Sequence, residues 1–267
     1  MTISTTLSQF AATLDAAQIP ARTATRVKHL MLDAIGIAFA SGKFDFARVA
    51  LAGIRKLGSG EATVIGMTDT LSPRDAALLN GLLIHGLDYD DTYLPGSMHL
   101  TASNVPAALA MAEAQHATGA ELLAACTAGL EVAARLAGAG KGGFQKAGFH
   151  ATGICAAFSC ALVAGRLMRL PVEQLTLAQG IALSTASGSM QPLRDGSWTK
   201  PIHPGWAASA GITAASMASV GYLSPEAAYE GHFGFYPLYL GAHAGTADLA
   251  LITQQLGRSE EHTSELQ

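Results

Sequence analysis

Residues 148–165, GFHATGICAAFSCALVAG, decide the fold class, because they form a long apolar segment without a single Asp, Glu, Lys or Arg. Small residues and hydroxyls interrupt this segment, and it lacks the dense large aliphatic side chains and basic flanks of a membrane-spanning helix. Residues 174–193 and 201–225 have the same character. We therefore predict helices buried in a large helical core, where small side chains allow close packing.

Apolar residues at three- and four-residue spacing predict helices on both sides of these segments. Ser72, Thr118 and Ser224 each occupy a position typical of a helix N-cap, with an acidic residue soon after. Only residues 61–67, EATVIGM, resemble a strand, and one strand cannot form a sheet. The fold is therefore predicted to be all-α, with the glycine-rich residues 138–148 as a mobile loop. We expect helices over 5–17, 21–41, 45–57, 73–87, 101–116, 119–138, 150–168, 172–187, 204–220 and 225–230.

The composition excludes several classes of protein. The chain has 267 residues, of which 49% are hydrophobic and 13% charged, and its formal net charge is −4. Such a chain has enough apolar surface to fold, and it lacks the basic clusters that bind nucleic acid or anionic lipid. Its three cysteines show no metal-ligand spacing, and its first residues do not form a secretory signal. We predict a cytoplasmic protein with reduced cysteines and no nucleic-acid or membrane partner.

The last ten residues, 258–267, read RSEEHTSELQ and differ abruptly from the alanine-rich sequence before them. This segment looks like the translation of a sequencing-library adapter, which would make it a non-native tail. We therefore predict one incomplete helical domain over residues 1–257, whose natural sequence continues further.

Residues 85–99, HGLDYDDTYLPGSMH, hold the densest group of polar side chains in the chain. If the preceding helix continued, His85, Asp88 and Asp91 would share one face of it, and Asp90 would turn away. Carboxylates and imidazoles so close together shift one another's pKa values, which is typical of groups that transfer protons. The alternative is a set of helix-terminal acids that serve only as caps.

A second polar group lies in residues 187–208, SGSMQPLRDGSWTKPIHPGWAA. Arg194, Lys200 and His203 stand in or beside one of the least charged parts of the chain, so each is expected to have a specific anionic partner. A carboxylate substrate is one such partner, and the N-terminal amides of the following helix also favour anions. Alternatively, Arg194 pairs with Asp195 at the surface and Lys200 extends to solvent.

Five segments, in this order, resemble the MmgE/PrpD family, which includes 2-methylcitrate dehydratase, cis-aconitate decarboxylase and iminodisuccinate epimerase. The resemblance extends to about Tyr236. It implies a large helical domain that carries the contact of a homodimer, a smaller α+β lid domain, and an active site in the groove between them. The lid and the final helices would be missing from this chain. The segments are LDAIGIAFAS, HGLDYDDTYLPGSMH, GFHATGICAAF, SGSMQ and DGSWTKPIHPGWAASAG.

The resemblance also implies roles for individual residues. Asp88, His99 and Lys200 match catalytic positions, Thr92 matches a substrate-binding position, and His150 is expected to be structural. Leu100 departs from the proline that usually follows the histidine in the family, and the family's lid histidine has no counterpart here. Further candidates for substrate binding are His85, Asp91, Gln191 and His203.

Together these residues predict a cofactor-independent lyase or isomerase that acts on a small di- or tricarboxylate. An imidazole such as His99 can move a proton at a carbon next to a carboxylate, and Lys200 with Thr92 can stabilise the enolate charge. Neither a dinucleotide-binding nor a phosphate-loop motif is present, so no cofactor and no metal are predicted. The chain as given is expected to be inactive by itself, because part of the groove is missing.

Two other functions remain open at this point. One is an all-α magnesium enzyme, in which the acids of DYDDT and His85 hold the ion for phosphate or diphosphate chemistry. The other is a non-catalytic helical module whose apolar surface binds a partner.

Overall fold

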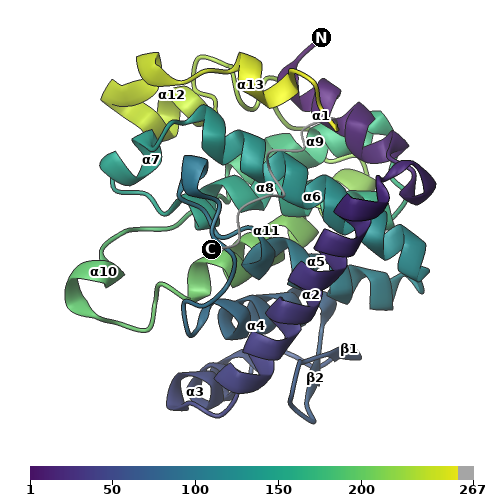
Figure 1. The fold of residues 1–267 in the computed structure, drawn as a ribbon, viewed down its shortest axis with the longest axis vertical. Coiled ribbons are helices and arrows are strands. Elements are labelled where there is room, and N and C mark those ends of the chain that lie inside the picture. Colours follow the sequence, from purple (N-terminus) through teal and green to yellow (C-terminus); the bar gives the residue numbers. More distant parts are fainter. Residues whose placement is uncertain (258–267) are drawn as a thin grey trace.

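The computed structural model describes residues 1–257, and nearly all of its regular structure is helical (Figure 1). Two helices, α8 (Ala151–Leu167) and α11 (Ile202–Ser219), pack against each other in the middle of the molecule. The prediction of an all-α fold is confirmed. Four helices surround this pair: α4 (Pro73–His85), α5 (Thr101–Ala114), α6 (Gly119–Ala139) and α9 (Val172–Leu183).

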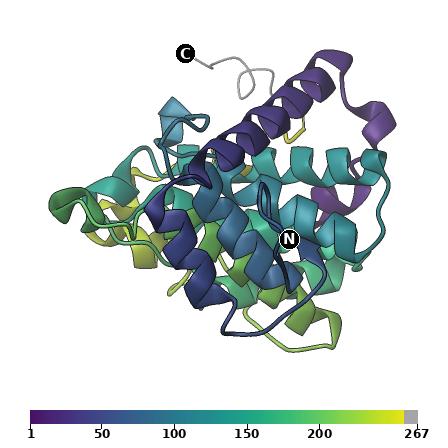
Figure 2. The same cartoon turned by 90° about the horizontal axis from the view of Figure 1, so that it is seen from below.

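The remaining elements lie around this core. Figure 2 shows the long helix α2 crossing the outside of the other helices, and it contacts α4, α5 and α6. Two very short antiparallel strands form a hairpin where a single strand was predicted. The outer elements are α1 (Ile3–Thr13), η1 (Ala16–Gln18), α2 (Ala21–Ser41), α3 (Asp45–Ile54), β1 (Ala62–Thr63), β2 (Thr70–Leu71), η2 (Leu94–Gly96), α7 (Gly143–Lys146), α10 (Pro192–Asp195), α12 (Phe235–Leu240), η3 (Gly241–Thr246) and α13 (Ala250–Thr253).

The charge-free segments form core helices, as predicted. Every residue of α8 except Arg166 is buried, because other helices cover it on all sides. Within residues 1–257, only α6 is long and apolar enough to cross a membrane by length and composition, and 72% of its most apolar window is buried among the other helices. Burial of this kind is typical of a core helix in a globular fold.

Two of the three predicted helix starts are confirmed, and the third is wrong. The Ser72 side chain accepts a hydrogen bond from the Asp75 amide, and Thr118 forms a full capping box with Glu121. Residues 225–230, in contrast, form turns, and the Ser224 hydroxyl donates to the Leu177 carbonyl oxygen instead of capping a helix. A local sequence signal failed here because a neighbouring helix offered the hydroxyl a better partner.

The glycine-rich residues 138–148 are not the open loop that the sequence predicted. Helix α6 extends to Ala139, and the short helix α7 follows after a turn. Phe144 is fully buried there and packs against Phe235 and Tyr236, with ring centroids 5.0 and 5.9 Å away. One aromatic side chain therefore anchors this segment to the C-terminal part of the fold.

Helices α4 and α11 cross at two glycines, which brings the two polar segments of the sequence together. A Cβ atom on Gly205 would lie 2.0 Å from the Leu78 carbonyl oxygen, and one on Gly81 would lie 2.5 Å from the Gly205 Cα. No larger side chain fits at this crossing without moving a helix. His85, at the end of α4, is thus held close to the start of α11.

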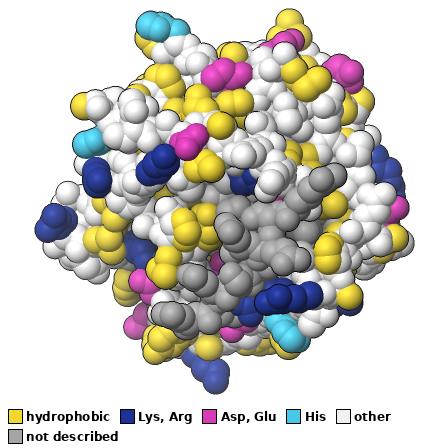
Figure 3. All heavy atoms as spheres, turned by 45° about the horizontal axis from the view of Figure 1, so that its top comes forward, with side chains coloured by type: hydrophobic (Ala, Val, Ile, Leu, Met, Phe, Trp, Pro, Cys, Tyr) yellow, Lys and Arg dark blue, Asp and Glu magenta, His cyan; other side chains and the backbone are white. Residues whose placement is uncertain are grey.

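The surface shows how few charged residues the chain has. On the face in Figure 3, Lys and Arg side chains lie scattered among polar and hydrophobic groups. The absence of a nucleic-acid partner stays a prediction.

Candidate active site

The end of α4 sets the geometry of the candidate site. The helix stops at His85, followed directly by Gly86, and Asp88 adopts a left-handed backbone conformation with φ of 57°. The chain then returns through a bridge between Tyr93 and Met98, which places His99 just before α5. The predicted common helix face is therefore wrong, because residues 86–93 are not helical.

His85, Asp90 and His99 form the buried part of the site. Nδ1 of His85 lies 2.9 and 3.1 Å from the two carboxylate oxygens of Asp90, and both side chains are fully buried. Nδ1 of His99 lies 3.5 Å from Oδ1 of Asp90, and the two imidazole centroids are 4.7 Å apart. Asp90, which the sequence predicted to turn away, is thus the carboxylate closest to both imidazoles. The glycine after His85 was the available signal that the helix ends there.

The exposed Asp88 and the half-buried Lys200 form the outer part of the site. The Lys200 ammonium donates a hydrogen bond to Oδ1 of Asp88, which also lies 3.7 Å from Nε2 of His99. Burial raises the pKa of Asp88, but the hydrogen bond and charge of Lys200, together with the charges of His85 and His99, lower it below 3.8 overall. The three predicted catalytic residues, Asp88, His99 and Lys200, therefore lie together.

His150 and His203 extend the cluster into the core. Their Nδ1 atoms are 3.1 Å apart, so one ring has to donate the hydrogen and the other to accept it. His150 also stacks on His85, with ring centroids 5.5 Å apart. The sequence motifs left His150 outside the set of site residues, and only the packing of α8 against α11 brings it next to the imidazole of His85.

The other candidates lie at the edge of this cluster or apart from it. Asp91 is buried, and it accepts hydrogen bonds from the amides of Leu100 and Thr101 at the start of α5. Burial raises its pKa above 3.8. Thr92 and Gln191 are exposed, and Thr92 has no hydrogen bond or ion pair within residues 1–257. The structure thus uses Asp91 to hold α5 in place, which differs from the predicted contact with a substrate.

A hollow of about 290 Å³ opens over the outer part of the cluster. Of the described residues that line it, Lys200 is the only Lys or Arg, and Asp88 and His85 also contribute to the lining. This volume and this single cation suit a small anion. The other lining residues are Gly86, Pro192, Leu193, Gly196, Ser197 and Pro201.

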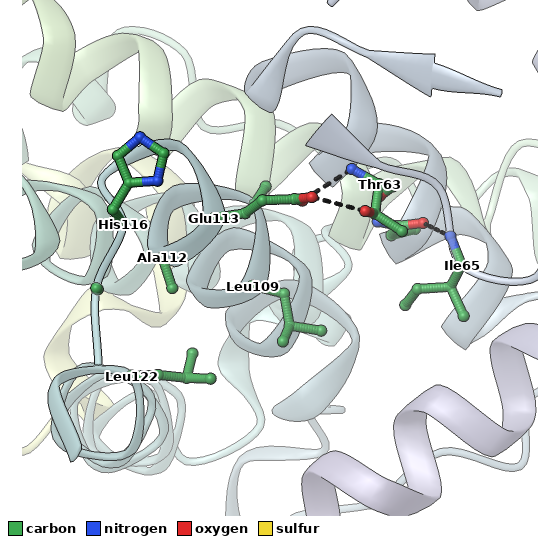
Figure 4. Close-up of a pocket in the computed structure, with 10 residues that line it drawn as sticks. Thr63, Ile65, Leu109, Ala112, Glu113, His116 and Leu122 are labelled. Atoms are coloured by element: carbon green, nitrogen blue, oxygen red, sulfur yellow. Dashed lines mark hydrogen bonds between the residues drawn. The ribbon is translucent and has the colours of Figure 1, made fainter. Parts of the chain in front are cut away.

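A larger hollow of about 540 Å³ lies on another part of the surface (Figure 4). Leu109, Ile65 and Leu122 make its lining mostly apolar. Its one carboxylate, Glu113, is engaged by the amide and hydroxyl of Thr63, at 2.8 and 2.7 Å. Asn80, which also lines it, is engaged by the Ile65 amide and the Thr63 carbonyl oxygen, so these polar groups of the hollow already bind one another.

Four side chains of the cluster could also act as ligands of a metal ion. His85, Asp88, Asp90 and His99 offer ligand atoms within 4.8 Å of one another, a spacing that a divalent ion could span. However, the Lys200 ammonium already binds Asp88, and the His85 imidazole occupies both oxygens of Asp90. A metal ion at this site would have to displace the Lys200 ammonium from Asp88, and the two positive charges would repel each other. Lys200 and His85 would therefore compete with a divalent ion for Asp88 and Asp90, and the absence of a metal stays a prediction.

The buried histidine pair makes the stability of the protein depend on pH. Burial first, then the charges of His85 and Lys200, lower the pKa of His150 to about 2 and that of His203 to about 4, from 6.5. In the unfolded chain both rings take up a proton near pH 6.5, whereas in the folded protein they stay neutral. Stability is therefore complete above pH 6.5 and decreases as the pH falls toward 4, by about 1.4 kcal/mol per pH unit for each such histidine.

Urea unfolding measured across this pH range tests the prediction. The His203→Asn variant is expected to show a smaller decrease in stability, because one of the two proton-binding groups is gone. The matched control is His116→Asn, which changes an exposed histidine. Equal pH slopes for wild type and His203→Asn would contradict the prediction.

Comparison with known proteins identifies the family of the chain. The family model for the MmgE/PrpD N-terminal domain matches residues 5–246. The chain is 30% identical over 225 residues to cis-aconitate decarboxylase of Homo sapiens, which covers 82% of this chain and 46% of that protein. It is 26% identical over 261 residues to a cis-aconitate decarboxylase-like protein of Aspergillus oryzae (94% and 52%), and 26% over 239 residues to cis-aconitate decarboxylase of Aspergillus terreus (87% and 49%).

These relatives are about twice as long as the matched part. The chain spans about half the length of the curated relatives that it matches. The family model, in contrast, covers most of the chain, including every residue of the cluster described above. The chain therefore belongs to the MmgE/PrpD family.

Proposed function

We propose that residues 1–257 are the N-terminal half of a lyase that acts on a small di- or tricarboxylate. The observation that carries this proposal is His99, which lies between the carboxylates of Asp88 and Asp90, because Asp88 and Lys200 line a hollow next to this ring. An imidazole in this position can exchange a proton at carbon, and the lysine can bind a substrate carboxylate. The names of the relatives support the same class of reaction, because they are decarboxylases of a tricarboxylate.

The proposed chemistry has two forms that share one carbanion-like state. In a dehydration, a base removes the proton next to a carboxylate, a double bond forms, and the hydroxyl on the neighbouring carbon leaves as water after protonation. In a decarboxylation, the bond to one carboxylate breaks, carbon dioxide leaves, and an acid protonates the carbon that keeps the electron pair. Both need a proton-carrying group next to the carbon and a fixed cation for the developing charge, which are the proposed roles of His99 and Lys200.

The proposal also concerns the oligomeric state and location of the whole protein. The whole protein forms a homodimer through its helical domain and is located in the cytoplasm. Its other half closes the groove over the cluster. The 267-residue chain by itself binds carboxylates weakly and has little turnover, because that half contributes part of the groove wall. Exposed hydrophobic side chains such as Leu32 and Phe39 on the outer face of α2 support a helical contact surface.

Proton NMR in D2O tests the proposed function. The longer protein that carries residues 1–257 is incubated with 2-methylcitrate, cis-aconitate and other small di- and tricarboxylates. Solvent deuterium is expected to enter one substrate or its product, and the His99→Ala variant is expected to lose this exchange by about a thousandfold. The matched control is His116→Ala, which removes a histidine outside the cluster.

Two outcomes would contradict the proposal. One is the absence of exchange and of product with every carboxylate, in a protein that is shown to be folded. The other is an undiminished rate in His99→Ala, which would remove this imidazole from the chemistry. Turnover by the 267-residue chain at the rate of the longer protein would contradict only the proposal that the second half is needed.

A further inference from the structure

Asp90 is the most deeply buried charged side chain of the cluster, and neither the motifs nor the proposed reaction gives it a role. Its side chain is fully buried, and both of its oxygens face Nδ1 of His85. Its Oδ1 also lies 3.5 Å from Nδ1 of His99, a buried atom that has no hydrogen bond within the described part of the chain. One carboxylate thus stands between two imidazoles.

The chemistry of a carboxylate decides which nitrogen of each ring carries the hydrogen. An ionised carboxylate can only accept hydrogen bonds, so the nitrogen that faces it has to be the one with the hydrogen. Asp90 therefore favours the Nδ1–H form of His85 through a hydrogen bond, and that of His99 through the charge of its carboxylate 3.5 Å away. The carboxylate of Asp88 faces Nε2 of His99 at 3.7 Å, but the Lys200 ammonium offsets its charge. In the Nδ1–H form, Nε2 of His99 has a free electron pair, and this nitrogen lies on the side of Asp88 and Lys200.

We propose that Asp90 is the positioning residue of this site. It holds His85 and His99 in the Nδ1–H form, so that Nε2 of His99 is the atom that exchanges a proton with the substrate. The catalytic consequence rests on the proposed function, whereas the state of the two imidazoles does not. A carboxylate that fixes an imidazole in one tautomer is a recurrent device for proton transfer.

Of the charged groups around His99, Asp90 has the largest influence on where its ring hydrogen lies. The groups that face this ring are His85 from the end of α4, Asp88 from the following loop, and His150 from the start of α8. Lys200, from before α11, balances the charge of Asp88, and His203 is in contact with His150. Asp90 has no Lys or Arg partner within residues 1–257, and its ion-pair contacts there are with the two imidazoles.

Nitrogen NMR of the histidine side chains tests the state of the rings in the 267-residue chain. Both His85 and His99 are expected to show the Nδ1–H pattern at neutral pH. In Asp90→Asn this pattern is expected to change, because the amide can donate as well as accept. The matched control is Asp91→Asn, which alters the neighbouring buried carboxylate that serves the amides at the start of α5. Asp91→Asn is expected to lower the stability of the protein and to leave the ring nitrogen signals of His85 unchanged.

The wild-type spectrum decides the question even if Asp90→Asn fails to fold. An Nε2–H pattern for His85 in the wild-type chain would overturn the proposal. An unchanged pattern in a folded Asp90→Asn variant would overturn it too, since the carboxylate would then not select the tautomer.

Kinetics of the longer protein test the consequence for catalysis. Asp90→Asn is expected to lower kcat at least about a hundredfold and to leave KM within about threefold, because Asp90 is buried behind the imidazoles. Loss of the negative charge makes a protonated imidazole less favourable, so the pH–rate profile is expected to move to lower pH. An increase in KM at unchanged kcat, or an unmoved profile, would overturn the positioning role. If no carboxylate is turned over, the proposed function fails, but the NMR result still stands.

Discussion

Replacement of Lys200 by alanine is expected to lower kcat/KM about a thousandfold, an effect as large as that expected for His99→Ala. Within residues 1–257, Lys200 is the only Lys or Arg that lines the hollow over the cluster, and its ammonium neutralises Asp88. Without it, the carboxylate of Asp88 repels an anionic substrate, and no fixed cation remains for the enolate charge. Steady-state kinetics of the longer protein on its identified substrate would measure the loss.

Two further variants separate the role of this cation from a general effect of charge. Arg194→Ala removes an exposed cation from the same segment, and it is expected to change kcat/KM less than about threefold. The double variant Lys200→Ala/Asp88→Asn removes both charges of the pair. If Lys200 acts on the substrate, the double variant stays as inactive as Lys200→Ala. Recovery of activity in the double variant would show that Lys200 only neutralises Asp88.

Replacement of Gly205 by alanine is expected to lower the free energy of unfolding by about 3 kcal/mol. The new methyl group would lie 2.0 Å from the Leu78 carbonyl oxygen and 3.1 Å from the Leu82 amide nitrogen, so helices α4 and α11 have to move apart. Because His85 ends one of these helices and His203 begins the other, the same movement would loosen the histidine cluster. Urea unfolding followed by circular dichroism would measure the change.

The matched control for this prediction is Gly36→Ala on helix α2. A Cβ atom at Gly36 meets nothing within 4 Å, and alanine is the better helix former by about 1 kcal/mol. This variant is therefore expected to be slightly more stable than the wild type. The prediction for Gly205 fails if the free energy of unfolding of Gly205→Ala is within about 1 kcal/mol of the wild-type value.

Local sequence signals determined much of the fold. The helix over residues 21–41 was predicted with the bounds that the structure has, because its apolar spacing and flanking residues act locally. The predictions that Ser72 and Thr118 cap helices were correct for the same reason, because an N-cap depends on the next three residues. The helix predicted at 225–230 was wrong, because the Ser224 hydroxyl binds a carbonyl oxygen 47 positions away in sequence.

The sequence by itself therefore determined that the fold is all-α and which segments form its core, whereas the grouping of Asp88, His99 and Lys200 in one site was implied by the family resemblance. Only the tertiary structure decided which of two adjacent carboxylates faces the imidazoles. Helical periodicity favoured Asp91, but the end of α4 at His85 and the left-handed backbone at Asp88 rotate the chain, so that Asp90 enters the cluster and Asp91 holds α5. The contact between His150 and His203 likewise depends on two core helices that pack closely, a long-range event that no local pattern encodes.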